Sequence, residues 1–332
     1  MDMSAAEVWW RYVPSSRIMV KSAANDLTDN GLSVQILPNF FPWKDQFELE
    51  LRECIDKYGS GIALRELNGN DLSQYTYLLD GIVHSLEIDN GFDGSLRSIG
   101  SNLPDEGCVI WLHDLSKAQQ AQCFDLSLKA AAVSGKGEFP RFVFVFESSL
   151  SGRHKGVKRI ESGDVCRSNI RYFAYRMLME ADLDQQIEYA VALVMELASA
   201  GTEHIGNLCE KIVRNGFEKE YQAIENDEKL LYSIHRAQIR SIEPLIQLGR
   251  LQLCQKYHAE IQKILPFDDD YSTTVSDPCE LELRHLWYRK SDIGFSKSDS
   301  ELLKKLYDAR NDLSHQRILA YPLISSLIDM YS

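Results

Sequence analysis

Cys108-Val109-Ile110-Trp111-Leu112-His113 is the stretch that decides the fold class of this 332-residue chain. A second stretch of the same kind, residues 141–146, reads Arg-Phe-Val-Phe-Val-Phe. Both are nearly continuous apolar runs, whereas a strand with one face in water alternates apolar and polar residues. They therefore predict two strands that are covered on both faces, as is typical of parallel sheets in α/β proteins.

Weaker patterns around these runs complete an alternation of strands and helices. Residues 32–37 (Leu-Ser-Val-Gln-Ile-Leu) predict a first strand, residues 44–58 a helix and residues 61–67 a second strand. We expect a fifth strand at residues 170–175. This order predicts a mostly parallel α/β sheet over residues 1–178.

The second half of the chain changes to helical periodicity. From about Ala181 onward, apolar residues recur at the spacing of helix turns. We expect a small helical segment over residues 179–225 and an all-α bundle over residues 226–332. Within the bundle, the pattern predicts one long helix that reaches about Ile264, followed by a surface loop at residues 266–279.

The composition narrows the function classes. The chain has 49 acidic and 36 basic residues and a formal net charge of -13, which argues against a general nucleic-acid coat. Its seven cysteines form no C-x-x-C pair, so we expect reduced thiols and no metal site. No apolar run approaches the roughly 18 residues of a membrane span, and no signal-peptide pattern opens the chain, so we expect a cytoplasmic protein without membrane contact.

Five strands in this rhythm, followed directly by a small helical segment, resemble AAA+ and STAND-type P-loop NTPases, in which a nucleotide lies between the sheet and a helical lid. A P-loop requires Gly-x-x-x-x-Gly-Lys-Ser/Thr after the first strand, because bare backbone N–H groups must wrap the phosphates. The corresponding turn, residues 38–44, reads Pro-Asn-Phe-Phe-Pro-Trp-Lys. The resemblance therefore implies an NTPase-like domain without its phosphate loop, and we expect no cofactor.

Two further pieces of the NTPase pattern are incomplete. Gly135-Lys136 precedes a predicted strand, whereas a P-loop follows one. His113-Asp114, at the end of the third strand, stands where the resemblance would place a magnesium-binding carboxylate. The alternative for Asp114 is an ordinary cap of the helix that follows.

The densest basic stretch is a candidate nucleic-acid contact. It contains Arg153, Lys155, Lys158 and Arg159 within seven residues of an acidic chain. Such a cluster can bind phosphate groups, but a run of charge is also typical of a solvated loop.

The candidate catalytic residues lie near the end of the sequence, where two helical stretches meet. Residues 310–315 read Arg-Asn-Asp-Leu-Ser-His and match the Arg-x(4 to 6)-His motif of the HEPN family, including the polar residue after the Arg. The resemblance implies a metal-independent endoribonuclease whose site is completed by two facing copies. His315 would then transfer a proton to or from the 2′-hydroxyl, Arg310 would stabilise charge on the phosphate, and Asn311 would orient one of them.

The spacing of this motif sets a geometric condition. Residues five apart on an ideal α-helix point about 140° away from each other. A shared site for Arg310 and His315 therefore requires a helix end, a bend or a second chain. Otherwise the motif marks a helical interaction module, with His315 near a helix C-terminus.

The combined layout resembles bacterial conflict and phage-defence proteins, in which sensor domains are joined to nucleases or adaptors. The first hypothesis is a non-ATPase scaffold or regulatory component of such a system that binds a protein partner. The first alternative is an endoribonuclease that uses Arg310 and His315, with RNA as substrate and a homodimer as the active form. The second alternative is a nucleotide-responsive protein with an atypical pocket.

Overall fold

The structure is a computed structural model of the whole chain. It describes residues 3–36, 42–59, 61–88, 93–103, 107–134, 142–149, 155–160, 167–181, 183–197, 201–268 and 274–331. The chain forms two compact units, residues 1–169 and residues 170–332.

The first unit contains a five-stranded parallel sheet. Its strands are β1 (Ser33–Ile36), β2 (Ala63–Asn68), β3 (Cys108–His113), β4 (Phe142–Glu147) and β5 (Val157–Ile160). They lie in the order β2-β3-β4-β1-β5, and every neighbouring pair is parallel. The predicted parallel α/β sheet is confirmed, and the first four strands lie where the sequence places them.

The fifth predicted strand is wrong. Residues 170–175 belong to the helix α7 (Arg167–Leu178), in which Phe173, Ala174 and Met177 are buried at helical spacing. The fifth strand of the sheet is instead β5, an edge strand with Lys158 and Arg159 at its centre. A short edge strand needs no apolar run, so its sequence carries little strand signal.

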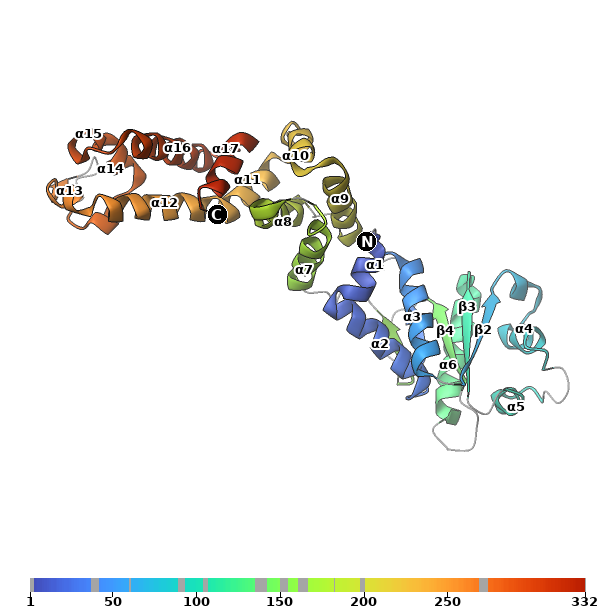
Figure 1. Ribbon diagram of the computed structural model, residues 1–332. Helices are drawn as coiled ribbons and strands as arrows, with labels where there is room; N and C mark the ends of the chain where they lie inside the picture. Colours follow the sequence, from blue (N-terminus) through green and yellow to red (C-terminus); the bar gives the residue numbers. More distant parts are fainter. Residues whose placement is uncertain are drawn as a thin grey trace. The chain divides into compact units, whose positions relative to one another are not determined.

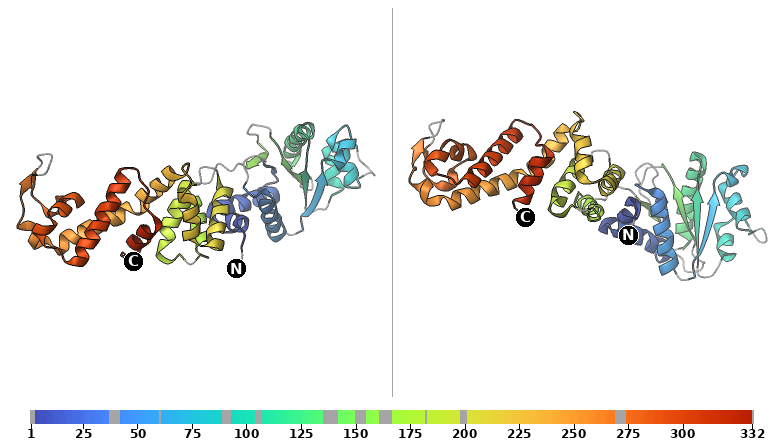
Figure 2. Two further views of the ribbon diagram at one scale, coloured as in Figure 1. Left: turned by 90° about the horizontal axis from the view of Figure 1, so that it is seen from above. Right: turned by 45° about the horizontal axis from the view of Figure 1, so that its top comes forward.

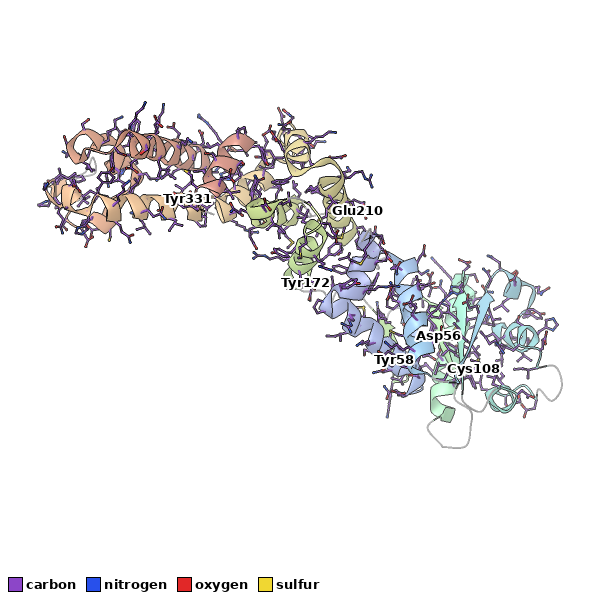
Figure 3. All side chains as sticks on the ribbon, viewed as in Figure 1. Asp56, Tyr58, Cys108, Tyr172, Glu210 and Tyr331 are labelled. Atoms are coloured by element: carbon purple, nitrogen blue, oxygen red, sulfur yellow. The ribbon has the colours of Figure 1, made fainter. Side chains whose placement is uncertain are left out.

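Helices cover both faces of the sheet, as the apolar strands require. On β3, Cys108, Ile110 and Leu112 belong to an apolar core shared with α4 (Leu78–Ser85), α5 (Leu96–Ser101) and α6 (Lys117–Ser134). The alternate residues of β3 point to the other face, which α2 (Pro14–Thr28) and α3 (Lys44–Tyr58) cover (Figure 1). Cys108 begins the strand (Figure 3). The predicted helix over residues 44–58 is confirmed as α3.

The second unit is helical. It contains most of α7 and the helices α8 (Ile187–Leu197), α9 (Thr202–Asn215), α10 (Phe217–Glu225), α11 (Leu231–Ser241), α12 (Glu243–Lys256), α13 (His258–Gln262), α14 (Leu283–Tyr288), α15 (Lys290–Ile293), α16 (Lys297–Ser314) and α17 (Tyr321–Asp329). The predicted long helix up to Ile264 is wrong, because the region divides into α11, α12 and α13. Pro244 stands in the first turn of α12, where proline starts a helix but cannot continue the preceding one.

Packing within this unit joins elements that are distant in sequence. α8 packs against α11, so residues 179–225 and 226–332 share one compact unit. α12 and α16 lie side by side (Figure 2). The two helices come close together at Gly249 of α12. A Cβ added there would lie 2.7 Å from Leu306 Cδ1 on α16 and 2.0 Å from the Tyr331 hydroxyl; Figure 3 labels Tyr331.

The predicted loop at residues 266–279 contains a two-stranded antiparallel pair, β6 (Phe267–Asp268) with β7 (Thr274–Val275).

Candidate functional site

The Arg310 to His315 motif occupies the C-terminal end of α16. The helix ends at Ser314, and the His315 N–H still donates to the carbonyl oxygens of Asn311 at 3.0 Å and Asp312 at 3.1 Å. The next residue, Gln316, has a φ of 59° and turns the chain out of the helix. The structure thus provides one of the conditions that the spacing demands, a helix end within the motif.

The side chains of the motif do not meet in one cavity. Arg310 is exposed and lines a cavity of about 300 Å³, with residues of α12 and of the segment before α14 as its other walls. His315 is exposed at the helix end and does not line this cavity. The Asn311 carbonyl accepts a hydrogen bond from Ser314 Oγ at 2.9 Å. A shared site for Arg310 and His315 would need groups from outside this cavity.

Charge in the Arg310 cavity is unfavourable for a phosphate. Its lining holds three carboxylates against two guanidinium groups: Glu243, Glu280, Glu282, Arg250 and Arg310. The Arg250 guanidinium donates to the carbonyl oxygens of Cys279 and Leu281 at 3.2 and 2.7 Å. These hydrogen bonds hold the backbone segment that forms one wall of the cavity. A phosphate placed there would meet more negative than positive charge.

A buried amide holds the segment that follows the motif. Gln238 on α11 is fully buried, and its Nε2 donates to the Leu319 carbonyl oxygen at 3.0 Å and to Tyr221 Oη at 2.8 Å. The Leu319 N–H donates back to Gln238 Oε1 at 2.8 Å. Burial raises the pKa of Tyr221 to about 12, so its hydroxyl keeps the proton that it donates to the Leu319 carbonyl oxygen. One turn earlier on α11, His235 Nε2 lies 2.8 Å from the Leu313 carbonyl oxygen.

Sequence reasoning missed Gln238. The signal was present, because Ile234, Ala237 and Ile242 place position 238 on the buried side of α11. A glutamine on an apolar helix face needs hydrogen-bond partners when it is buried. Those partners lie some 80 residues away in the sequence, so the pattern alone could not name them.

The other end of α16 is fixed by Asp299. Its carboxylate accepts from Lys256 Nζ at 2.8 Å and from Tyr257 Oη at 2.6 Å, both at the end of α12. Ser296 caps the helix by accepting from the Asp299 N–H at 3.1 Å. Hydrogen bonds from Lys256, Ser296 and Tyr257 hold the pKa of Asp299 at about 2. α16 is therefore held at both ends.

In the α/β unit, internal ion pairs occupy the place where a P-loop NTPase would have its phosphate loop. Lys44, the first residue of α3, pairs with Glu147 at the end of β4, and its Nζ lies 3.6 Å from Glu48 Oε1. Trp10 is buried, and its Nε1 donates to the carbonyl oxygens of Pro42 at 3.0 Å and Trp43 at 3.2 Å. The lysine charge is thus balanced within the fold. Residues 38–41 of this turn, and Gly135-Lys136, lie outside the described residues.

His113-Asp114 has local partners. His113 stacks on Trp111 with ring centroids 5.8 Å apart, and its two ring nitrogens lie 3.9 Å from Glu48 and 3.8 Å from Glu66. Asp114 accepts from Asn68 Nδ2 at 2.8 Å. The expected capping role of Asp114 is wrong, because Ser116 accepts from the Gln119 N–H at the start of α6. Asp114 instead ties the end of β3 to the end of β2.

The basic cluster is not gathered on one surface where the structure describes it. Lys158 Nζ lies 2.5 Å from Asp26 Oδ2, so its charge is balanced by α2. Arg159 is the next residue of β5, and successive strand residues point to opposite faces. Lys155 is exposed, whereas Arg153 lies outside the described residues. Nucleic-acid binding by this cluster stays a prediction.

Within the described ranges, no group of three or more His, Cys, Asp and Glu side chains could hold a metal ion. Over the same residues, no helix combines the length and apolar character that crossing a bilayer requires. The six cysteines that the structure describes are free thiols: Cys54, Cys108, Cys123, Cys209, Cys254 and Cys279. No protein-family model matches the chain, and no curated protein matches it either.

Proposed function

We propose that the protein is a non-ATPase scaffold or regulatory component of a bacterial defence or conflict system. In this proposal the helical unit binds a basic segment of a protein partner. The observation that carries it is an acidic hollow of about 660 Å³ that is lined by the start of α10, by both ends of α17 and by the turn before α8. A neighbouring hollow of about 480 Å³ shares Glu218, Tyr321 and Asp329 with it.

Charge and shape in the hollow suit an arginine or lysine side chain. Asp184, Glu218 and Asp329 line it, and Lys219 is the one cation among the described residues that line it. Phe217 and Tyr321 add aromatic surface against which the apolar stem of a long basic side chain can pack. Carboxylates around an open hollow attract a basic segment and orient its charged groups.

The wall of the hollow is held in place before any partner arrives. Tyr321 Oη donates to Gln186 Oε1 at 2.6 Å, and Gln186 Nε2 donates to Ser325 Oγ at 3.0 Å. Burial raises the pKa of Tyr321, so this hydroxyl remains a donor at neutral pH. A preformed wall reduces the ordering cost of binding.

The α/β unit supports the scaffold part of the proposal. P-loop NTPases of the AAA+ and STAND type place the strand before the phosphate loop between the fourth and fifth strands, and β1 lies between β4 and β5 here. The lysine at the start of the following helix is balanced by Glu147 and Glu48, which leaves it no free charge for a nucleotide. We therefore infer an NTPase-like architecture that is used without ATP hydrolysis.

A binding measurement tests the proposal. A fluorescent arginine-rich peptide should bind the full chain at low salt, and Glu218→Lys should weaken that binding about tenfold or more because an attraction becomes a repulsion. Glu228→Lys, an equal charge change at an exposed residue outside the hollow, serves as the control. Equal loss in both variants would show nonspecific attraction by the acidic chain and would reject this site.

The alternative function is a metal-independent endoribonuclease that uses Arg310 and His315. One observation favours it: α16 ends inside the motif and leaves both side chains exposed. A second copy of the chain could therefore approach them and supply the groups that the Arg310 cavity lacks.

A further inference from the structure

A second cavity on α16 has the opposite charge from the one that holds Arg310. It has a volume of about 510 Å³ and lies among α14, α15 and the first two turns of α16. Lys290, Lys297 and Lys304 line it, and Glu301 is the one carboxylate among the described residues of its lining. In a chain of net charge -13, this is a local basic site.

The three lysines have no carboxylate partner within ion-pair distance among the residues that the structure describes. Lys297 and Lys304 are seven residues apart on α16, so they lie on one face of the helix, two turns from each other. Lys290 belongs to α15 and lines the same cavity. Charges that approach one cavity from two elements can hold a polyanionic group between them.

An aromatic wall accompanies these charges. Trp287 is stacked on Tyr307, with ring centroids 5.5 Å apart and an interplanar angle of 10°. The Lys290 ammonium lies over the Trp287 ring, 3.5 Å from the ring centroid. Phe295 follows Gly294, whose φ of 73° reverses the chain between α15 and α16. The ring surface under Lys290 is thus the part of the cavity where a flat apolar group can replace a flexible side chain.

We propose that this cavity binds a nucleoside phosphate, either as a free nucleotide or as one unit of a single-stranded RNA. Lys297 and Lys304 contact phosphate oxygens. The base takes the place of Lys290 over Trp287, and the displaced Lys290 ammonium moves to the phosphate. Stacking on an aromatic ring beside a basic wall is the usual chemistry of single-strand binding, and the volume lies within the range of nucleotide-sized sites.

The position of the cavity makes this inference independent of the acidic hollow and of the Arg310 motif. Lys304 precedes Arg310 by six residues, about 9 Å along the helix axis at 1.5 Å per residue. Residues six apart on an ideal α-helix also point about 120° away from each other, so Lys304 and Arg310 lie on different faces of α16. The two cavities share no lining residue.

One labelled RNA, three competitors and two double variants test the proposal. The affinity of a fluorescent ten-nucleotide oligouridine is measured by fluorescence anisotropy, and AMP, ATP and inorganic phosphate are added as competitors. Lys297→Ala with Lys304→Ala should weaken binding at least tenfold. It should also reduce the slope of log affinity against log salt by about 1.4, because each phosphate contact on a single strand contributes about 0.7. The control pair is Lys211→Ala with Lys229→Ala, two exposed lysines of the same unit outside this cavity.

The competitors separate the two sources of the ligand. RNA binding that millimolar AMP does not displace supports an RNA strand, whereas tight binding of AMP or ATP that displaces RNA supports a free nucleotide. Inorganic phosphate that competes as well as AMP would overturn the claim for a nucleoside. Unchanged RNA and AMP affinity in the Lys297 and Lys304 variant, or no binding of either ligand at millimolar concentration, would overturn the site. Glu218→Lys should leave this binding unchanged, so failure here is distinguishable from failure of the protein-partner proposal.

Discussion

Gln238 and Leu319 are joined by two hydrogen bonds that run in opposite directions. Gln238 Nε2 donates to the Leu319 carbonyl oxygen at 3.0 Å, and the Leu319 N–H donates to Gln238 Oε1 at 2.8 Å. The Gln238 side-chain amide thus provides hydrogen-bond partners for both the N–H and the carbonyl oxygen of Leu319, a residue that lies outside any helix or strand. This pair fixes where the chain goes after α16 ends, and with it the surroundings of His315 and the start of α17.

Gln238→Leu should lower the free energy of unfolding by about 2 to 3 kcal/mol. The substitution keeps the volume similar but leaves the buried Leu319 N–H without its partner, and one unsatisfied buried group costs about 1 to 3 kcal/mol. Urea unfolding followed by circular dichroism measures the change. Gln255→Leu, the same substitution at an exposed residue of α12, is the control and should change the unfolding free energy by less than about 0.5 kcal/mol. Equal effects of the two would contradict the role assigned to Gln238.

The anchor at the start of α16 should respond to pH. The pKa of Asp299 is about 2 in the folded protein, below its ordinary value of 3.8, because Lys256, Ser296 and Tyr257 donate to the carboxylate. Its stabilising contribution is therefore complete above about pH 4 and is lost as the pH falls toward 2. The difference in unfolding free energy between wild type and Asp299→Asn should be constant from pH 7 to pH 5 and should shrink below pH 4. A difference that stays constant down to pH 2.5 would show that the carboxylate charge is not what holds the anchor.

The parts of the fold that the sequence predicted well are those with strong local patterns. β3 is six residues of nearly continuous apolar sequence, and α3 begins shortly after two prolines in the sequence, Pro38 and Pro42. β5 failed because an edge strand that holds Lys158 and Arg159 has no apolar signature. The long helix up to Ile264 failed because Pro244 interrupts it, although its apolar periodicity continues across the break.

The candidate site was predictable only along α16 itself. The motif indicated a helix end near His315, and the helix does end there. The carboxylates beside Arg310 could not be predicted, because Glu243 and Glu282 come from other elements and reach the cavity only through tertiary packing. The same limit applies to the basic cavity, whose lysines come from two helices, α15 and α16.

Gly69→Ala should destabilise the α/β unit by about 1 to 3 kcal/mol. An added Cβ would lie 2.6 Å from the Asp114 carbonyl oxygen and 2.9 Å from its carbonyl carbon, and backbone atoms cannot move aside without shifting the end of β3. The Gly69 N–H also donates to the His113 carbonyl oxygen at 2.7 Å, so the two strand ends would separate. Thermal unfolding measures the effect. A rise in melting temperature, as expected for Gly→Ala at an unconstrained loop position, would refute the close approach.

Lys44→Met should lower stability and leave any nucleotide affinity unchanged. The substitution removes the cation between Glu147 and Glu48, both partly buried, which costs roughly 1 to 2 kcal/mol. Lys117→Met, at an exposed position of α6, is the control. Urea unfolding gives the stability, and titration with ATP gives the affinity. Loss of ATP binding in Lys44→Met alone would mean that this lysine serves a phosphate site after all.

The scaffold and endoribonuclease proposals predict different results with RNA. If the protein is a scaffold, purified protein should not cleave RNA in the presence of a metal chelator. If it is an endoribonuclease, cleavage should rise more steeply than linearly with protein concentration, because Arg310 and His315 do not share a cavity within one chain. His315→Ala and Arg310→Ala should then each abolish cleavage, and a mixture of the two variants should recover part of it through mixed dimers. His204→Ala, at an exposed histidine outside the motif, controls for loss of a surface imidazole. Cleavage that is linear in protein and survives His315→Ala would assign the activity to neither residue.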